Sequence, residues 1–295
     1  MMSKKVKRRF GDRKDGALVR DLDGMHFVVP NIFNGRCNNE AFISLMVDLT
    51  EANRYLEERN AQNPKFKYTL FHLVVTALVK CLTLRPKMNR FISNKNVYQR
   101  NEVTASFVVK KQFADEAKEG LAFLHTKEDS TLDTIHEEIR RQVQDCRKGK
   151  GDASSDAMDV FNRMPRFLSK FILFLVTRLN IHGWVPKFLI ETDPYYSSVL
   201  LSNLGSIGMH SGYHHLANWG TNSVFVTVGL IKKRPFYADD GSVTMKESVD
   251  LGLTIDERLA DGYYYSKTIK LLKYLLEHPR LLERPLIEEV TYDEH

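Results

Sequence analysis

Two short segments in the C-terminal half of the sequence place polar and charged side chains where strands end. Residues 254–264, TIDERLADGYY, begin as a strand, pass through a charged turn and lead into a helix. Residues 201–208, LSNLGSIG, end another strand with a serine and an asparagine. Carboxylates and hydroxyls at such places can move protons and donate hydrogen bonds to a developing charge.

Several common mechanisms are excluded by the motifs. The sequence has no G-x-x-x-x-G-K-[ST], G-x-G-x-x-G, H-E-x-x-H or G-x-S-x-G. Of the ten histidines only His214 and His215 are adjacent in sequence, and adjacent side chains point apart, so we expect no bound metal. The three cysteines, Cys37, Cys81 and Cys146, are far apart, which is typical of thiols in a reducing cytoplasm.

The composition describes an ordered chain with a large core. Of 295 residues, 43% are hydrophobic and 27% charged, which excludes a disordered or collagen-like chain. Most of the formal charge of +6 comes from the first 16 residues, with seven basic and two acidic side chains. We expect this run to be solvated, with contact to an anionic membrane as an alternative. No nucleic-acid motif and no secretory signal are present, so we expect no nucleic-acid partner and a cytoplasmic protein.

The order of predicted elements indicates an α+β fold with a mixed, largely antiparallel sheet, because strands do not simply alternate with crossover helices. Residues 248–255 alternate apolar and polar, as a strand with one buried face does. Residues 69–84 are apolar nearly all round and predict a central buried helix. The other predicted strands are 42–49, 103–111, 198–204 and 223–231, and the other helices are 50–63, 131–147 and 264–277.

Two consecutive segments look like an insertion. Residues 147–159 are hydrophilic and predict a flexible surface loop. Residues 167–190 are the most apolar stretch, but their longest uncharged run, 171–177, is too short to cross a bilayer. They predict two short helices joined near 180–183, which pack in the core or on a second subunit, contact a membrane interface, or line a ligand tunnel.

The charged turn carries a family resemblance. The sequence D-E-R-L-A-D-G at 256–262, followed by an apolar helix ending in E-H-P at 277–279, resembles the D-H-R-x-x-D-G segment and closing helix of the dihydrolipoyl acyltransferase catalytic domain of 2-oxoacid dehydrogenase complexes. The S-N-L-G segment at 202–205 resembles that family's S-N-(I/L)-G, at a similar separation. Residues 71–91 resemble its buried helix and A-L-x-x-x-P-x-x-N turn.

This resemblance implies a chloramphenicol acetyltransferase-like two-layer sandwich over residues 41–295, preceded by a basic extension at 1–40 and interrupted by the insertion. It implies a homotrimer with its site between subunits, where CoA or acyl-CoA is a substrate. In such enzymes a histidine takes a proton from the thiol of CoA or dihydrolipoamide, and a hydroxyl stabilises the oxyanion. At the matching positions stand Ser202 as oxyanion donor, Glu257 in the place of the base, and Asp261, Arg258 and Asn203 as supports of the site.

Glutamate in place of histidine is the main departure from the family. A thiol of pKa about 8.5 gives its proton to a carboxylate of pKa about 4.3 less easily than to an imidazole of about 6.5, and the difference is about 3 kcal/mol, or a hundredfold in rate. Burial of a carboxyl group can reduce this cost. Glu257 is therefore either the base or a salt-bridged residue of a noncatalytic turn.

Other residues keep two interpretations. His214 and His215 are alternative candidates for the base, or an ordinary histidine pair. Tyr263 and Tyr264 either line a substrate tunnel or pack the last helix. Ser202 is either the oxyanion donor or a hydroxyl bonded to backbone.

We therefore expect a CoA-dependent acyltransferase acting on a small thiol, hydroxyl or amine acceptor. A noncatalytic protein that keeps the fold as a binding module or scaffold is the alternative. Only some 40 residues precede the match, so we expect no lipoyl group on this chain. Peripheral contact with a membrane is a third expectation, from the basic run and residues 167–190.

Overall fold

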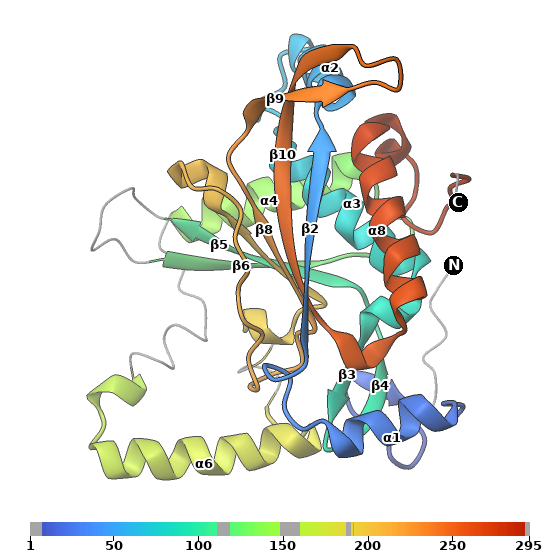
Figure 1. The fold of residues 1–295 in the computed structure, drawn as a ribbon. Coiled ribbons are helices and arrows are strands. Elements are labelled where there is room, and N and C mark those ends of the chain that lie inside the picture. The colour runs from blue at the N-terminus through green and yellow to red at the C-terminus, as the bar shows by residue number, and fades with distance from the viewer. Residues whose placement is uncertain (1–7, 111–118, 148–159, 187–189, 191, 293–295) are drawn as a thin grey trace.

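A mixed sheet forms the centre of the molecule (Figure 1). The computed structural model describes residues 8–110, 119–147, 160–186, 190 and 192–292. Among them the strand order is β2-β10-β8-β7-β5-β6, with β9 also paired to β10. The strands are β2 (Glu40–Asp48), β5 (Thr104–Lys110), β6 (Glu119–His125), β7 (Val199–Asn203), β8 (Val224–Val228), β9 (Lys232–Tyr237) and β10 (Val243–Asp256). Pairs β5–β7 and β7–β8 are parallel and the other described pairs are antiparallel, which confirms the predicted α+β class.

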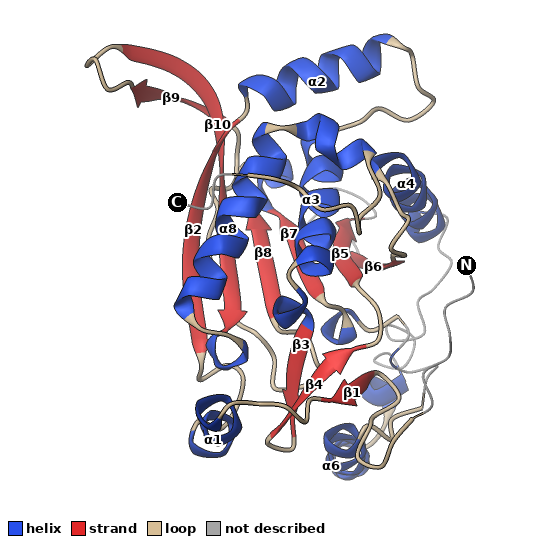
Figure 2. Ribbon diagram, turned by 90° about the vertical axis from the view of Figure 1, so that its right-hand side faces the viewer, coloured by secondary structure: helices blue, strands red, loops and turns tan. Residues whose placement is uncertain are grey.

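Helices cover one face of this sheet (Figure 2). They are α2 (Thr50–Ala61), α3 (Leu70–Leu84), α4 (Leu132–Arg147) and α8 (Gly262–Glu277). In α3 every residue from His72 to Leu82 is buried, so the prediction of a central buried helix is confirmed. The boundaries differ from the predicted ones by a few residues; helix α2, for example, begins at Thr50 as predicted but ends at Ala61 rather than at 63.

On the opposite face of the sheet an extended segment, residues 209–219, lies over β8 and β10. The predicted alternation in β10 is confirmed, with Val249, Leu251, Leu253 and Ile255 in the core under the helices. On the other face Gly252 lies directly beneath this segment, since a Cβ there would be 2.1 Å from the carbonyl oxygen of Gly212. The centre of β10 is therefore buried on both faces, by the hydrophobic core on one side and by the extended segment on the other.

A small sheet and helix α1 (Gly24–Ile32) lie at the lower end of the molecule in Figure 1. The sheet consists of β1 (Gly16–Leu18), β4 (Asn96–Arg100) and β3 (Arg90–Ser93). Arg13 is buried beneath them with its guanidinium over Phe91 and Tyr98. Its charge is balanced by Asp15, 2.8 Å away.

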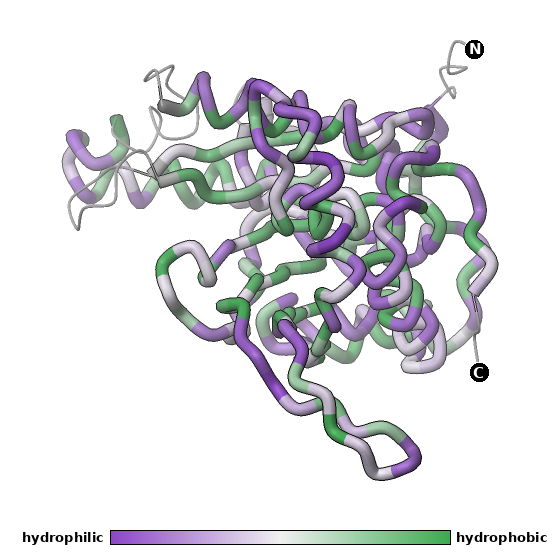
Figure 3. The backbone as a smooth tube through the Cα atoms, turned by 90° about the horizontal axis from the view of Figure 1, so that it is seen from above, coloured by the Kyte–Doolittle hydropathy of each residue, from purple (hydrophilic) through white to green (hydrophobic). Residues whose placement is uncertain are grey.

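Two elements project from the body. The hairpin of β9 and β10 extends beyond it, as Figures 2 and 3 show. Helix α6 (Arg166–His182) extends along the lower end in Figure 1 and stops at Gly183, which has a φ of 70°. The loop predicted at 147–159 lies outside the described residues from 148 on, and so do residues 187–189 of the second helix predicted after 183. No helix among the described residues has the length and apolar character needed to cross a membrane.

The apolar stretch does not pack in the core of the chain. Asn180 is the buried residue of α6, whereas Phe167, Phe171 and Phe174 are exposed. The expectation of core packing is therefore wrong for the single chain. Asn180 lies in the last turn of α6, which is attached to the rest of the chain, and the exposed phenylalanines lie in the projecting part of the helix.

Candidate active site

Ser202 stands near the end of β7 on the face covered by the extended segment. Its cross-strand neighbour is Thr227 of β8, which in turn lies opposite Gly252 of β10. The Thr227 hydroxyl donates to the carbonyl of Gly212 and so fixes the segment over the sheet. Between segment and strand end lies an open hollow of about 550 Å³, lined by Ser202, Leu204, Thr227 and the run from Gly208 to His214.

The S-N-L-G sequence forms a tight turn beside this hollow. Asn203 caps the short helix Leu204–Ile207, because its side-chain oxygen accepts a hydrogen bond of 3.2 Å from the Ser206 N–H. At Gly205 a Cβ would lie 2.5 Å from the carbonyl oxygen of Gly229, so only glycine allows this approach. A second hollow of about 350 Å³ lies on the other side of the turn, with Asn203, Gly205 and Ser206 in its wall.

His214 lies in the wall of the same hollow as Ser202. Its ring is stacked on Phe225, with centroids 4.3 Å apart and planes 7° apart. Its Nδ1 is 2.9 Å from the carbonyl oxygen of His215. Because a carbonyl only accepts, Nδ1 carries the proton and Nε2 of the neutral ring is a proton acceptor.

His215 points elsewhere, as expected for adjacent residues. Its Nδ1 is 2.7 Å from a carboxylate oxygen of Glu40 at the start of β2. Glu40 is also the acceptor for the N–H of Leu216. A buried carboxylate therefore anchors the extended segment and orients an exposed imidazole.

The charged turn at Glu257 combines a buried ion pair with an exposed carboxylate. Asp256 is fully buried and accepts two hydrogen bonds from Arg258, of 2.8 and 2.7 Å. Arg258 also donates to the carbonyl of Phe33, so the turn is tied to the end of α1. Arg36 approaches Asp256 to 3.9 Å, and burial lowers the pKa of its guanidinium to about 10. The carboxylate of Glu257 is exposed above this buried ion pair.

Asp261 is the N-cap of α8, with its carboxylate 2.8 Å from the N–H of Tyr264. That hydrogen bond lowers the pKa of Asp261. Tyr264 has its hydroxyl 3.1 Å from the N–H of Lys87, and the Arg85 guanidinium lies 3.9 Å from its ring centroid. The ring of Tyr263 is exposed under the ammonium of Lys267. Their assignment to a substrate tunnel stays a prediction.

Within one chain the two motif segments do not meet. Ser202 is in register with Gly252, two strands away, and Glu257 follows Gly252 by five residues. At about 3.3 Å per residue and about 4.8 Å per strand, the two residues are separated by roughly 17 Å along the sheet and roughly 10 Å across it. A reaction that uses both side chains therefore needs two chains.

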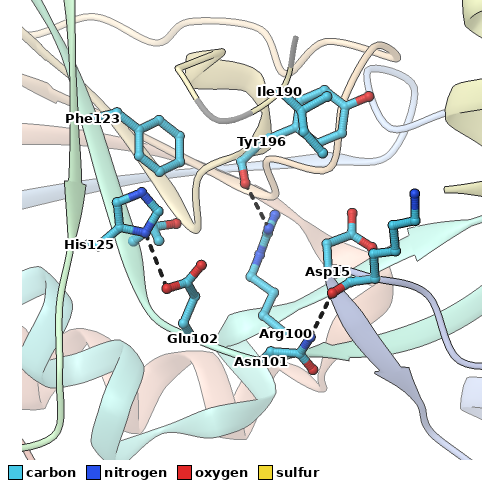
Figure 4. A pocket seen from close by; sticks show the side chains of 10 residues that line it. Asp15, Arg100, Asn101, Glu102, Phe123, His125, Ile190 and Tyr196 are labelled. Atoms are coloured by element: carbon cyan, nitrogen blue, oxygen red, sulfur yellow. Dashed lines mark hydrogen bonds and ion pairs between the residues drawn. The ribbon is translucent and has the colours of Figure 1, made fainter. Parts of the chain in front are cut away.

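A further cavity of about 160 Å³ lies beside β5 and β6, far from β10 (Figure 4). Arg100 is buried in its wall and donates to the carbonyl of Tyr196, and burial lowers its pKa to about 9. His125 and Glu102 form a pair of 3.2 Å at its mouth. No residue of the two motif segments lines this cavity, so it is not the candidate site.

Sequence reasoning missed several residues that shape the site. Glu40 and Thr227 hold the extended segment, and Arg36 lies against the buried ion pair. Glu40 is the first residue of β2, whereas His215 lies in a segment without regular structure, and their contact depends on the path of that segment across the sheet. A hydrophobic pattern specifies which face of a strand is buried but not which residue of another strand it meets.

The fold places the chain in a known class. A chloramphenicol acetyltransferase chain shares it, at a TM-score of 0.53 and 14% identity over 88% of this chain and 99% of that chain. A probable dihydrolipoamide acetyltransferase from Listeria monocytogenes superposes with a TM-score of 0.60 at 17% identity, covering 88% of this chain and 94% of the other. A dihydrolipoamide acetyltransferase from Azotobacter vinelandii, studied for the role of a serine, a histidine and an asparagine in its catalytic mechanism, gives a TM-score of 0.61 at 14% identity, with 90% and 94% coverage. The chloramphenicol acetyltransferase-like fold is thus confirmed.

Within that class the chain resembles the 2-oxoacid dehydrogenase acyltransferase catalytic domain, whose family description matches residues 191–283. This match includes both motif segments and confirms the resemblance inferred from them. The lipoamide acyltransferase component of the branched-chain alpha-keto acid dehydrogenase complex of Bacillus subtilis is 20% identical over 240 residues, which are 80% of this chain and 46% of that protein. The chain thus spans about half the length of that curated relative.

Proposed function

We propose that this protein transfers an acyl group between CoA and a small thiol, hydroxyl or amine acceptor, in a homotrimer whose sites lie between subunits. The observation that carries the proposal is the position of Ser202, at a strand end that opens into a hollow. The resemblance of the surrounding S-N-L-G turn to the acyltransferase family supports it.

The chemistry follows from a base and a hydroxyl. The base takes the proton of the attacking thiol, and the thiolate adds to the thioester carbonyl carbon. The carbonyl oxygen then becomes an oxyanion, to which the Ser202 hydroxyl donates a hydrogen bond before the other thiolate leaves. Loss of one such donor costs about 10²- to 10³-fold in kcat, which is the effect we expect for Ser202→Ala.

The base in this proposal is Glu257 of a second chain. Its carboxylate is exposed, and the ion pair of Asp256 and Arg258 below holds the turn in place. Since one chain holds Glu257 and Ser202 at opposite ends of the sheet, a symmetric assembly can bring the turn of one copy to the hollow of the next. Packing against that copy would also remove water from the carboxylate.

His214 is the second candidate for the base, because it shares the hollow with Ser202 in the same chain. Its Nδ1 is held by a carbonyl, which leaves Nε2 to accept a proton. This arrangement needs no second chain for the proton transfer.

Titration of the purified protein with CoA and with acetyl-CoA by calorimetry tests the proposal before an acceptor is known. Micromolar binding that weakens in Gly205→Ala, which closes the turn beside the hollow, is the expected result. The noncatalytic alternative rests on the missing histidine at position 257, and absence of binding to either ligand would favour it.

Mixing two inactive variants identifies the base. If Glu257 acts across an interface, refolding Glu257→Gln with Ser202→Ala chains restores intact sites, and equal amounts should recover about a quarter of the wild-type rate. If His214 acts within its own chain, a His214→Gln and Ser202→Ala mixture recovers nothing, since each hollow keeps one defect. The same two-variant mixture prepared without unfolding, so that chains do not exchange, is the control.

A further inference from the structure

Helix α6 is attached to the protein at one end. Arg13 donates from Nη1 to the carbonyls of Asn180 and Ile181, at 2.9 and 3.2 Å. Tyr196 donates to the side-chain oxygen of Asn180 at 2.6 Å. These anchors lie in the last turn, and Figure 1 shows the rest of the helix extending away from the sheet. Hydrogen bonds thus fix the last turn of α6, while the rest of the helix is exposed.

The exposed helix has two different sides. At 100° per residue, Phe167, Phe171 and Leu175 fall on one side together with Leu168 and Ile172. Its opposite side carries Arg166, Lys170, Ser169 and Thr177, with Leu173 among them. An apolar side facing water costs free energy unless a partner covers it.

Charge indicates what kind of partner covers it. Between residues 160 and 190 the sequence has five basic residues and no aspartate or glutamate. Two copies packed through this helix would bring like charges together with no carboxylate of the segment to pair with them. An anionic surface would pair with them instead.

A second helix lies at the same end of the molecule. Figure 1 shows α1 and α6 both running along the lower end, and Figure 2, turned by 90°, shows both nearly end-on. Their axes are therefore roughly parallel. Helix α1 exposes Met25, Phe27 and Ile32, and Trp184 is exposed just after α6. Two helices in one layer, with a tryptophan beside them, suit a flat apolar boundary with water.

We propose that this face, made by α6, Trp184 and α1, docks the protein on an anionic lipid bilayer. The apolar side of α6 enters the boundary between headgroups and acyl chains, and the basic side chains contact lipid phosphates. Arg178 lies on the apolar side, between Phe167 and Phe171, and its long side chain extends the charged end to the headgroups. The charged turn lies at this end as well, because Arg258 is bonded to the end of α1.

Vesicle sedimentation tests this docking. The full chain is mixed with vesicles of phosphatidylcholine, and of phosphatidylcholine with about 30% phosphatidylglycerol, at about 0.15 M salt. We expect the protein to bind the anionic vesicles and to be released at about 1 M salt. Binding to the neutral vesicles should be at least tenfold weaker, since each basic residue at an anionic surface contributes about 1 kcal/mol. Fluorescence of Trp184, which is 65% exposed, should shift to the blue on binding.

Two leucines of α6 provide a matched pair of variants. Leu175 is 43% exposed on the apolar side, and Leu173 is 50% exposed on the basic side. We expect Leu175→Ser to weaken vesicle binding about tenfold, at about 0.8 kcal/mol per buried carbon, and Leu173→Ser to leave it within about twofold. Lys170→Gln should weaken binding to anionic vesicles about fivefold and leave binding to neutral ones unchanged.

Three results would overturn the proposal. One is no binding to either vesicle by a wild-type chain that has a cooperative thermal transition. Another is equal loss of binding in Leu173→Ser and Leu175→Ser. The last is an assembly in solution that dissociates in Leu175→Ser but not in Leu173→Ser, with no vesicle binding, because a second copy would then cover α6. The exposed leucines leave the core intact, so circular dichroism of both variants should match the wild type.

Discussion

The imidazole of His215 is hydrogen-bonded to the carboxylate of Glu40, with 2.7 Å between Nδ1 and Oε2. The two side chains differ sharply in environment, since Glu40 is 4% and His215 79% exposed. Glu40 lies directly across from Asp256 in the β2–β10 ladder. The residue that holds the extended segment and the first residue of the charged turn are therefore cross-strand neighbours. The wall of the Ser202 hollow is therefore attached to the sheet next to the other motif segment.

Glu40→Ala should loosen this wall. The change removes the acceptor for both His215 and the N–H of Leu216, which leaves a main-chain donor to find water, at a cost of about 1–3 kcal/mol. We expect a lower denaturation midpoint and faster amide exchange in residues 213–216. In the control, His215→Asn, the bond from Leu216 stays and the loss should be smaller. Equal losses would contradict the role given to Glu40.

Asp256 and Glu257 are adjacent carboxylates with opposite roles. Asp256→Asn leaves the buried guanidinium of Arg258 without its counter-charge, which costs about 3–5 kcal/mol, or roughly 10 °C in Tm. Glu257→Gln changes an exposed side chain and should alter stability by less than about 0.5 kcal/mol. Thermal unfolding of both variants measures the difference. A strongly destabilised Glu257→Gln would mean that its carboxylate supports the fold.

Gly252→Ala should displace the extended segment from the sheet. The new methyl group would meet the carbonyl oxygen of Gly212, so strand and segment must separate, at a cost of about 1–3 kcal/mol. The hollow at Ser202 changes shape with them, and CoA affinity should fall. Gly262→Ala is the matched control, because a Cβ there meets nothing within 4 Å and alanine favours a helix. Unchanged stability and affinity in Gly252→Ala would show that the segment yields without cost.

The sequence predicted those parts of the fold that depend on local pattern. The alternation of β10 and the apolar run of α3 appear where expected, because burial selects residue type at a fixed period. The S-N-L-G turn and the charged turn were found through their motifs. Both are local too, since Asn203 and Asp261 cap helices that start within the same segment.

Other features depend on contacts between distant residues and were not predicted. That Gly212 lies on Gly252, and that Glu40 meets His215, follows from strand register and the path of a segment without regular structure. The exposure of α6 could not be predicted either, because the hydrophobic pattern of an apolar helix is the same whether a sheet, a subunit or a membrane covers it. Whether Glu257 meets Ser202 depends on a second chain.

The pair of His72 and His136 should make the protein sensitive to acid. Burial, together with the nearby His136, lowers the pKa of His72 to about 3, and the two rings are 4.7 Å apart. An unfolded histidine, with a pKa near 6.5, binds a proton that the folded one refuses, so stability falls as pH drops from about 6.5 toward 3. The slope from one such group reaches about 1.4 kcal/mol per pH unit.

Urea unfolding of the wild type and of His72→Gln at several pH values between 7 and about 4 measures this slope. In the wild type the N–H of Thr69 donates a hydrogen bond of 3.0 Å to Nδ1 of His72. The side-chain oxygen of glutamine can accept this hydrogen bond instead, so the start of α3 stays capped. We expect the variant to lose less stability than the wild type as pH falls, and its curve to be flatter although His136 remains. His210→Gln, in an exposed position, is the control and should follow the wild type. Parallel curves for wild type and His72→Gln would show that other groups cause the acid sensitivity.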